Sequence, residues 1–227
     1  MHEPPEMIAR GDGTAGEVAL RRRAGQGAPV YELIVNGTFI MDTAETSTER
    51  LLADALLDRH GSPRRILVGG LGLGFTLAAL LADPRVERVD TVELEPLLVE
   101  WLRAGLVPGA AVLLTDPRAH VIVGDVRDTL QSAPEAGYDA MVLDVDNGPG
   151  FLVRDANAAV YERPSLRAAA RALAPGGLLA VWSAAPAPEL AAVLADVVGD
   201  VTELVRAVPR EGREIEYYIY IAERPSP

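Results

Sequence analysis

Two aspartates, Asp144 and Asp146, stand two positions apart at the end of a predicted strand, residues 140–144. Side chains two positions apart in an extended segment share a face, so both carboxylates can point into one cavity. Such a pair attracts a cationic amine and can accept a proton from it. The amine must lose this proton before it can attack, because amines are protonated below about pH 10. We therefore predict that both aspartates are catalytic. A simple turn at residues 146–149 (DNGP) is the alternative interpretation.

A glycine-rich loop at residues 69–74 (GGLGLG) joins a predicted strand to a predicted helix. Glycine lets the backbone approach a ligand closely, and open parallel sheets bind ligands where their strands end. The next predicted strand ends at Glu93, whose carboxylate can accept hydrogen bonds from both hydroxyls of a ribose. Loop and acid together predict a nucleoside site, with Gly70, Gly72, Gly74 and Glu93 as cofactor-binding residues. A tight packing turn is the alternative for the loop.

The composition excludes several kinds of chemistry. All 21 basic residues among the 227 are arginine, so no lysine is present for a Schiff base or a nucleotide-hydrolase phosphate loop. There is no cysteine, which excludes disulfides and thiolate catalysis, and the 3 histidines are too scattered to predict a metal site. The net charge of −12 attracts cations and repels phosphate backbones. We expect a small cationic molecule as the partner, and no nucleic acid.

We expect a cytoplasmic protein with no membrane partner. The first ten residues have no apolar segment of the kind that signal peptides contain. The uncharged stretch at residues 66–82 contains 4 glycines and a turn, so we predict a strand, a loop and a helix there rather than a membrane span.

The elements that must position these residues alternate between strand and helix from residue 64 onward. The strands are apolar throughout, which predicts a parallel sheet with helices on both faces, an α/β fold of Rossmann-like type. Too few residues separate the last two predicted strands, 201–208 and 215–221, for a helix, so an antiparallel pair closes the sheet. Successive side chains of a strand point to opposite faces, so we expect Tyr217 on one face of the last strand and Tyr218 and Tyr220 on the other. Trp182 is expected in the core.

The first part of the chain predicts a small β element followed by one helix. Residues 1–10 look like a loose lead-in, and the Asn36-Gly37 pair is a strong hairpin signal. Thr46 and Glu49 have the spacing of a capping box that opens a helix. We expect two domains, an N-terminal β-hairpin plus helix at 1–60 and a Rossmann-like nucleoside-binding domain at 61–227.

The glycine spacing resembles that of class I S-adenosylmethionine-dependent methyltransferases. Dinucleotide enzymes use G-x-G-x-x-G, whereas the third glycine here comes one residue early, as G-x-G-x-G. A terminal antiparallel pair also marks that fold. The resemblance implies a mostly parallel seven-stranded sheet, and it places Asp125 and Val126, after the third strand, beside the adenine. A helix N-cap is the alternative role for Asp125.

From about residue 30 to residue 182, the chain is similar to the spermidine synthase (polyamine aminopropyltransferase) branch of that fold. The similarity rests on V-E-L-E-P at residues 92–96, the short N-terminal β element and the acidic segment at Asp144. It implies that Asp144 orients the attacking amine and that Glu93 holds the ribose. It also implies a homodimer.

Three departures from that family bear on the reaction. The family loop reads G-G-G-D-G-G, and its aspartate holds the amine of the aminopropyl group, but Gly72 stands in that place here. The family's D-S-S-D-P is replaced by D-V-D-N at residues 144–147, which brings the second carboxylate one residue closer. The Y-H-E stretch of the polyamine site appears as S-T-E, ending at Glu49. Tyr161 follows where the family has further acceptor-side residues, so Glu49 and Tyr161 are the predicted substrate-binding residues.

Three functions remain open. The first is methyl transfer from S-adenosylmethionine to a small amine, and the second is aminopropyl transfer from decarboxylated S-adenosylmethionine. The third is nucleoside binding without transfer. Gly72 favours the first, the acidic loop and the N-terminal β element favour the second, and the presence of Asp144 disfavours the third. We predict alkyl transfer from a sulfonium nucleoside to an amine, with methyl transfer slightly ahead.

Overall fold

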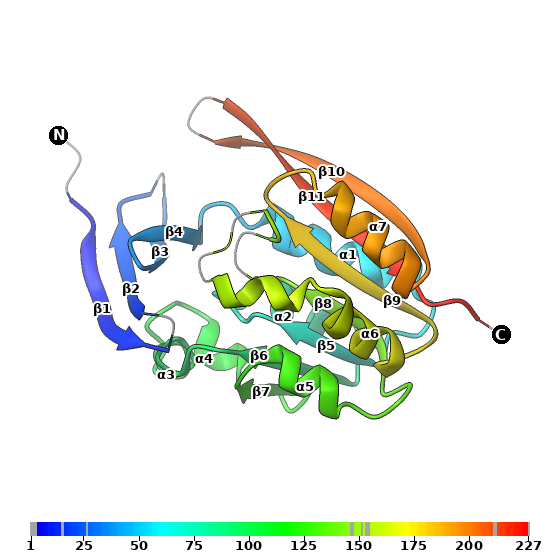
Figure 1. Cartoon of the computed structure of the whole chain (residues 1–227). Helices are drawn as coiled ribbons and strands as arrows, with labels where there is room; N and C mark the ends of the chain where they lie inside the picture. Colours follow the sequence, from blue (N-terminus) through cyan, green and yellow to red (C-terminus); the bar gives the residue numbers. More distant parts are fainter. Residues whose placement is uncertain are drawn as a thin grey trace.

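A seven-stranded sheet forms the centre of the computed structural model, which describes residues 4–14, 16–25, 27–145, 148–150, 152, 155–210 and 213–226 (Figure 1). Five of its strands run parallel to one another, while the last two in the chain pair antiparallel, as predicted. In spatial order the strands are β10 (Asp200–Arg210), β11 (Arg213–Glu223), β9 (Leu173–Ser183), β8 (Tyr138–Leu143), β5 (Arg65–Gly69), β6 (Arg88–Glu93) and β7 (Ala119–Val123).

Helices cover both faces of this sheet because its strands are apolar on both sides. In β5, for example, Ile66 and Val68 pack in one buried cluster, and Leu67 between them packs in the other. The first cluster includes α1 (Ser47–Arg59), α2 (Phe75–Ala82), α3 (Pro96–Arg103) and the short α4 (Ala110–Leu113). The second includes α5 (Val126–Ser132), the 3₁₀ helix η1 (Asp155–Val160), α6 (Arg163–Ala172) and α7 (Pro188–Val197).

The N-terminal segment is a four-stranded antiparallel sheet beside the larger one (blue in Figure 1). The prediction for residues 1–10 was wrong over its described part, because β1 pairs with β2 along its length. Ion pairs Arg22–Glu6 and Arg10–Glu17 cross between these two strands. The four strands are β1 (Glu6–Gly13), β2 (Gly16–Arg23), β3 (Val30–Val35) and β4 (Thr38–Asp42).

One local prediction also needs correction. The helix after β4 begins where the capping-box spacing predicted, but Thr46 makes no side-chain capping hydrogen bond. Its hydroxyl instead accepts a bond from Arg50 Nε (3.3 Å), and the Glu49 carboxylate accepts one from Thr48 Oγ1 (2.8 Å).

The N-terminal sheet and the larger sheet share one buried interior. Val18, Leu20 and Leu33 from the small sheet pack in the same cluster as α1, α2 and α3. The turn between β1 and β2 contacts the start of α3, where the Thr14 backbone N–H donates to the Glu95 carboxylate (2.7 Å). The small sheet is thereby held over the ends of the central strands. No helix among the described residues is long and apolar enough to cross a membrane.

Candidate active site

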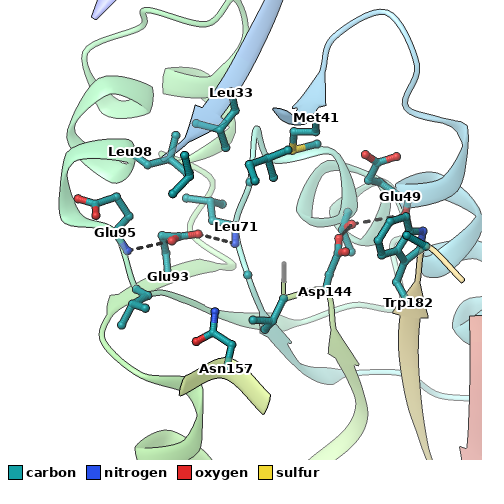
Figure 2. A pocket seen from close by; sticks show the side chains of 18 of the residues that line it. Leu33, Met41, Glu49, Leu71, Glu93, Glu95, Leu98, Asp144, Asn157 and Trp182 are labelled. Atoms are coloured by element: carbon teal, nitrogen blue, oxygen red, sulfur yellow. Dashed lines mark hydrogen bonds between the residues drawn. The ribbon is translucent and has the colours of Figure 1, made fainter. Parts of the chain in front are cut away.

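A cavity of about 510 Å³ lies between the small sheet and the carboxyl ends of the central strands. This volume suits a small organic ligand, since such sites usually hold about 300–1,000 Å³. Figure 2 shows the cavity with Glu93 and Leu71 on one side and Asp144, Glu49 and Trp182 on the other. The predicted residues that line it are Gly70, Gly72, Glu93, Asp125, Val126, Asp144 and Glu49.

The glycine loop brings its backbone against the end of β8. Gly70 adopts a positive φ of 98°, and its N–H donates to the Val92 carbonyl (2.8 Å). A Cβ atom at Gly70 would lie 2.1 Å from the Asp144 backbone oxygen, so no side chain fits there. Gly74 is the N-cap residue of α2 with a φ of 91°, and it does not line the cavity as Gly70 and Gly72 do.

Glu93 ends β6 and holds the glycine loop in place. Its carboxylate accepts hydrogen bonds from the N–H groups of Leu71 and Glu95, each at 2.9 Å (Figure 2). Burial raises the pKa of Glu93, and the backbone N–H groups that favour its charged form oppose that rise. A carboxylate fixed in this way at the rim of a cavity is prepared to accept further hydrogen bonds from a ligand's hydroxyl groups.

Asp125 has one of the two roles that the sequence left open, and it also borders the cavity. It is the N-cap of α5, because its carboxylate accepts a bond from the Arg127 N–H (2.8 Å), and it pairs with the Arg127 guanidinium (2.6 Å). It also lines the cavity together with Val126. The Val126 side chain packs so tightly on the loop that a Cβ at Gly69 would lie 2.9 Å from it. The cap is therefore present, and the predicted contact with adenine stays a prediction.

Asp144 follows β8 at the floor of the cavity, and its N–H donates to the Gly69 carbonyl (2.8 Å). Burial raises the pKa of its carboxyl to about 7, and the nearby Glu49 carboxylate adds to the rise. A hydrogen bond from Thr76 Oγ1 (3.3 Å) opposes it. A carboxyl with a pKa near neutrality is well matched to accepting a proton at neutral pH.

The other residues predicted to contact the acceptor differ in where they lie relative to the cavity. Glu49 lies in the first turn of α1 and faces the cavity near Asp144. Tyr161 is buried, and its hydroxyl donates to the Val145 carbonyl (2.5 Å). It thereby holds the backbone of the residue directly after Asp144, and direct contact with a substrate stays a prediction. Asp146 lies outside the described residues.

Sequence reasoning missed several residues of the cavity wall. Met41 of β4 lies over Gly72, and its Sδ accepts a hydrogen bond from the Leu73 N–H (3.2 Å). Trp182, expected in the core, packs against one of the buried clusters, but it also lines the cavity and contacts the ring of Tyr217 on β11. The alternation along the last strand contained the signal for Tyr217, but only the strand order shows that its face borders the cavity.

Replacing Gly70 with alanine is expected to destabilise the fold by more than about 1 kcal/mol. The positive φ disfavours a Cβ, and the atom would collide with the backbone of Asp144. Gly61→Ala is the matched control, because a Cβ there meets nothing within 4 Å. Denaturant unfolding of the two variants measures the difference. Equal free energies of unfolding would contradict the close approach of loop and strand.

Comparison with known proteins agrees with the family resemblance in the sequence. Residues 45–206 match the spermine/spermidine synthase domain. The polyamine aminopropyltransferase of Mycobacterium tuberculosis H37Rv is 37% identical over 142 residues, which are 61% of this chain and 26% of that protein. Putrescine N-methyltransferase 3 of Nicotiana tabacum is 34% identical over 118 residues, 52% of this chain and 29% of that protein. The chain thus spans roughly a quarter of the length of these relatives.

Solved structures show the same fold at low sequence identity. A spermidine synthase in complex with the transition state analogue AdoDATO superposes with a TM-score of 0.83 at 16% identity, covering 98% of this chain and 75% of that one. The spermidine synthase of Thermotoga maritima gives a TM-score of 0.82 at 17% identity, with coverages of 98% and 74%. The small N-terminal sheet and the Rossmann-like sheet are therefore parts of one shared architecture.

Proposed function

This chain belongs to the spermine/spermidine synthase domain family, and we propose that it transfers an aminopropyl group from decarboxylated S-adenosylmethionine to a small amine. The family match and the aminopropyltransferase relative support this reaction better than methyl transfer, which the sequence alone had placed slightly ahead. The observation that carries the proposal is the position of Asp144. Its carboxyl lies in the same cavity as Glu93 and the glycine loop, next to a second acid, Glu49.

In this proposal the glycine-loop side of the cavity binds the nucleoside. Glu93 accepts hydrogen bonds from the two ribose hydroxyls, while Asp125 and Val126 border the adenine. The fixed carboxylate of Glu93 and the lack of side chains at Gly70 and Gly72 fit a ligand that lies close to the backbone.

The transfer step then needs alignment more than covalent help. The lone pair of the amine nitrogen forms a bond to the carbon beside the sulfonium, and the carbon–sulfur bond breaks with its electron pair going to sulfur. The products are methylthioadenosine and an alkylated ammonium, which carries the positive charge that the sulfonium loses. Asp144 accepts the proton that frees the amine for attack, and Glu49 helps to hold the ammonium before it is deprotonated.

Methyl transfer is the second candidate, and the environment of Gly72 is the observation that favours it. No acid stands at this position, and the space above it holds the thioether of Met41. A donor's ammonium group therefore lacks a carboxylate partner at residue 72. The resemblance to putrescine N-methyltransferase 3 supports the same alternative.

The double change Met41→Ala with Gly72→Asp is expected to raise the preference for the decarboxylated donor over S-adenosylmethionine by about tenfold. A carboxylate there would pair with an ammonium and repel the donor's carboxylate. Met41 must be shortened because a Cβ at residue 72 would lie 2.6 Å from its sulfur. The ratio of kcat/KM for the two donors is the measurement, with Met41→Ala and Gly72→Asn together as the uncharged control. An unchanged ratio would mean that residue 72 does not face the donor's tail.

Turnover with each donor tests the proposed reaction directly. The protein is incubated with a mixture of small amines and either S-adenosylmethionine or its decarboxylated form, and the nucleoside product is identified by mass spectrometry. Methylthioadenosine from the decarboxylated donor supports aminopropyl transfer. S-adenosylhomocysteine from the other donor would establish methyl transfer in its place. If neither product forms, both candidate reactions are overturned.

A further inference from the structure

The turn that joins β1 to β2 begins at Gly13 and Thr14 and lies against the start of α3. The Thr14 backbone N–H donates to Glu95 Oε2 (2.7 Å). The approach is close, because a Cβ at Gly11 would lie 2.7 Å from Leu97 Cδ1 and one at Gly13 would lie 2.1 Å from Glu95 Oε2. The two glycines stand two positions apart in a strand, so they share the face that meets α3. A side chain at either position would therefore collide with the start of this helix.

Glu95 connects the β1–β2 turn to the carboxylate of Glu93. The Glu95 carboxylate is buried and also accepts a hydrogen bond from the Leu97 N–H (3.0 Å), as the N-cap of α3. The Glu95 backbone N–H donates to Glu93 Oε1 (2.9 Å), and the Leu71 N–H donates to Glu93 Oε2 (2.9 Å). Figure 2 shows these last two bonds as dashed lines, with the Glu95 carboxylate directed away from Glu93. A continuous series of hydrogen bonds thus runs from the turn to the cavity.

The direction of the Glu95 side chain matters because two carboxylates lie close together at this edge of the cavity. Burial raises the pKa of Glu93, and the charge of Glu95 adds to this rise. The N–H groups of Thr14 and Leu97 hold the Glu95 carboxylate on the side that faces β1. Without the bond from Thr14, this carboxylate is free to turn toward Glu93 and to disfavour its charged form.

The docking of the turn depends on few contacts. β1 is the edge strand of the small sheet, and most of its side chains are exposed. It is held by its pairing with β2 and by its contact with α3. Segments with few buried contacts open locally at a low cost in free energy. A ligand that binds the docked arrangement more tightly can therefore shift this equilibrium.

We propose that Glu95 is a positioning residue of the nucleoside site: the β1–β2 turn holds its side chain, and its backbone N–H orients the Glu93 carboxylate toward the ribose. The inference rests on the proposed function, because it gives the outermost strand of the small sheet a part in binding the donor. Docking of the turn and binding of the nucleoside then favour each other, since coupling between two sites is reciprocal.

Glu95→Asp tests the proposal without removing the charge or the helix cap. Aspartate is a favoured N-cap residue, but its shorter side chain does not reach the turn. The variant is expected to weaken methylthioadenosine binding about tenfold in calorimetric titration. Glu100→Asp, at an exposed position of the same helix, is the matched control. An unchanged affinity in Glu95→Asp would overturn the proposal.

Gly13→Ala disturbs the same contact from the opposite side. Its Cβ would collide with Glu95 Oε2, and the bond from Thr14 is lost whether the turn or the carboxylate moves. The affinity should fall as in Glu95→Asp, and the double variant should bind no more weakly than either single one. Gly27→Ala is the control within the small sheet, because a Cβ there meets nothing within 4 Å. Losses that add in the double variant would mean that the two residues act independently, against the proposal.

Steady-state kinetics separate a positioning role from a general loss of structure. In Glu95→Asp, the KM for the donor should rise about tenfold, while kcat should change by less than about twofold. The reason is that Asp144 and Glu49 lie on the other side of the cavity from Glu95 (Figure 2). A lower kcat with an unchanged KM would contradict a role in binding the donor.

Amide hydrogen exchange of the ligand-free protein separates this inference from the proposed function. Glu95→Asp should speed exchange about tenfold at Leu71, whose N–H donates to Glu93. Exchange at Thr43, whose N–H donates to the Tyr31 carbonyl in the small sheet, should stay unchanged. If Leu71 exchanges faster but no nucleoside binds, the proposed function fails and the role of Glu95 in holding Glu93 stands. If methylthioadenosine binds and product forms, but neither the affinity nor the exchange at Leu71 changes in Glu95→Asp, the proposed function stands and the inference fails.

Discussion

Asp144→Asn is expected to slow alkyl transfer by about a thousandfold while changing the affinity for the nucleoside little. The amide cannot accept the proton that the attacking amine must lose, yet it keeps the size of the side chain. Single-turnover rates at saturating donor and amine measure the chemical step. A rate within about tenfold of the unmodified protein would remove Asp144 from the role of base.

The pH dependence gives this prediction a second readout. Because the pKa of Asp144 is raised to about 7, its carboxylate forms only as the pH rises through neutrality, so the rate should increase across that range. Thr76→Val removes the hydrogen bond that favours the charged form, and it is expected to move the increase to higher pH. A rate that stays constant between about pH 6 and about pH 8, the range around this pKa of about 7, would contradict the assignment.

The same pKa shift predicts a conflict between stability and function at Asp144. A carboxyl whose folded pKa lies above its unfolded value of 3.8 favours folding when protonated, and this contribution is lost as the pH rises through about 7. Asp144→Asn should therefore raise the melting temperature at pH values above about 7, and this gain should disappear below pH 3.8.

Glu93→Ala is expected to weaken binding of methylthioadenosine by about a hundredfold or more. It removes two hydrogen bonds from ribose hydroxyls to a charged group, each contributing about 1.5–3 kcal/mol. Calorimetric titration measures the loss. The exposed Glu100→Ala on α3 is the matched control for removing one negative charge.

Glu93 also holds the loop through the Leu71 and Glu95 N–H groups, so its loss can act through the fold as well. Glu93→Gln separates the two effects, because the amide oxygen can still accept one of these backbone bonds. Its melting temperature should lie closer to that of the unmodified protein than the alanine variant's does. If Glu93→Ala still binds methylthioadenosine with unchanged affinity, the ribose site lies elsewhere.

The central sheet was predictable because its signal is local. Each parallel strand contains a short apolar run, and such runs are buried in the interior strands of a parallel sheet. The edge strand β7 is the exception, because its Ile122 and Val123 stay exposed. The strand β1 was not predictable in this way. Most of its side chains are exposed. The strand is held by its pairing with β2 and by the hydrogen bond between Thr14 and Glu95, two residues that lie far apart in the sequence.

The meeting of Glu93 and the glycine loop in one cavity was also largely predictable, since Glu93 ends a strand and the loop at residues 69–74 follows one. The opposite wall of the cavity was not. It joins Trp182 and Tyr217, which come together only because β11 returns antiparallel beside β9. Met41 reaches Gly72 through the placement of the small sheet over the central strands, for which the sequence has no local signal.

Calorimetric titration of the unmodified protein with decarboxylated S-adenosylmethionine, S-adenosylmethionine, methylthioadenosine and S-adenosylhomocysteine tests the central claim most directly. Alkyl transfer from a sulfonium nucleoside requires that the cavity at Glu93 binds these ligands. The proposed aminopropyl transfer predicts tighter binding of the decarboxylated donor and methylthioadenosine than of the other pair. The reverse order would favour methyl transfer, and binding of none of the four would contradict the account.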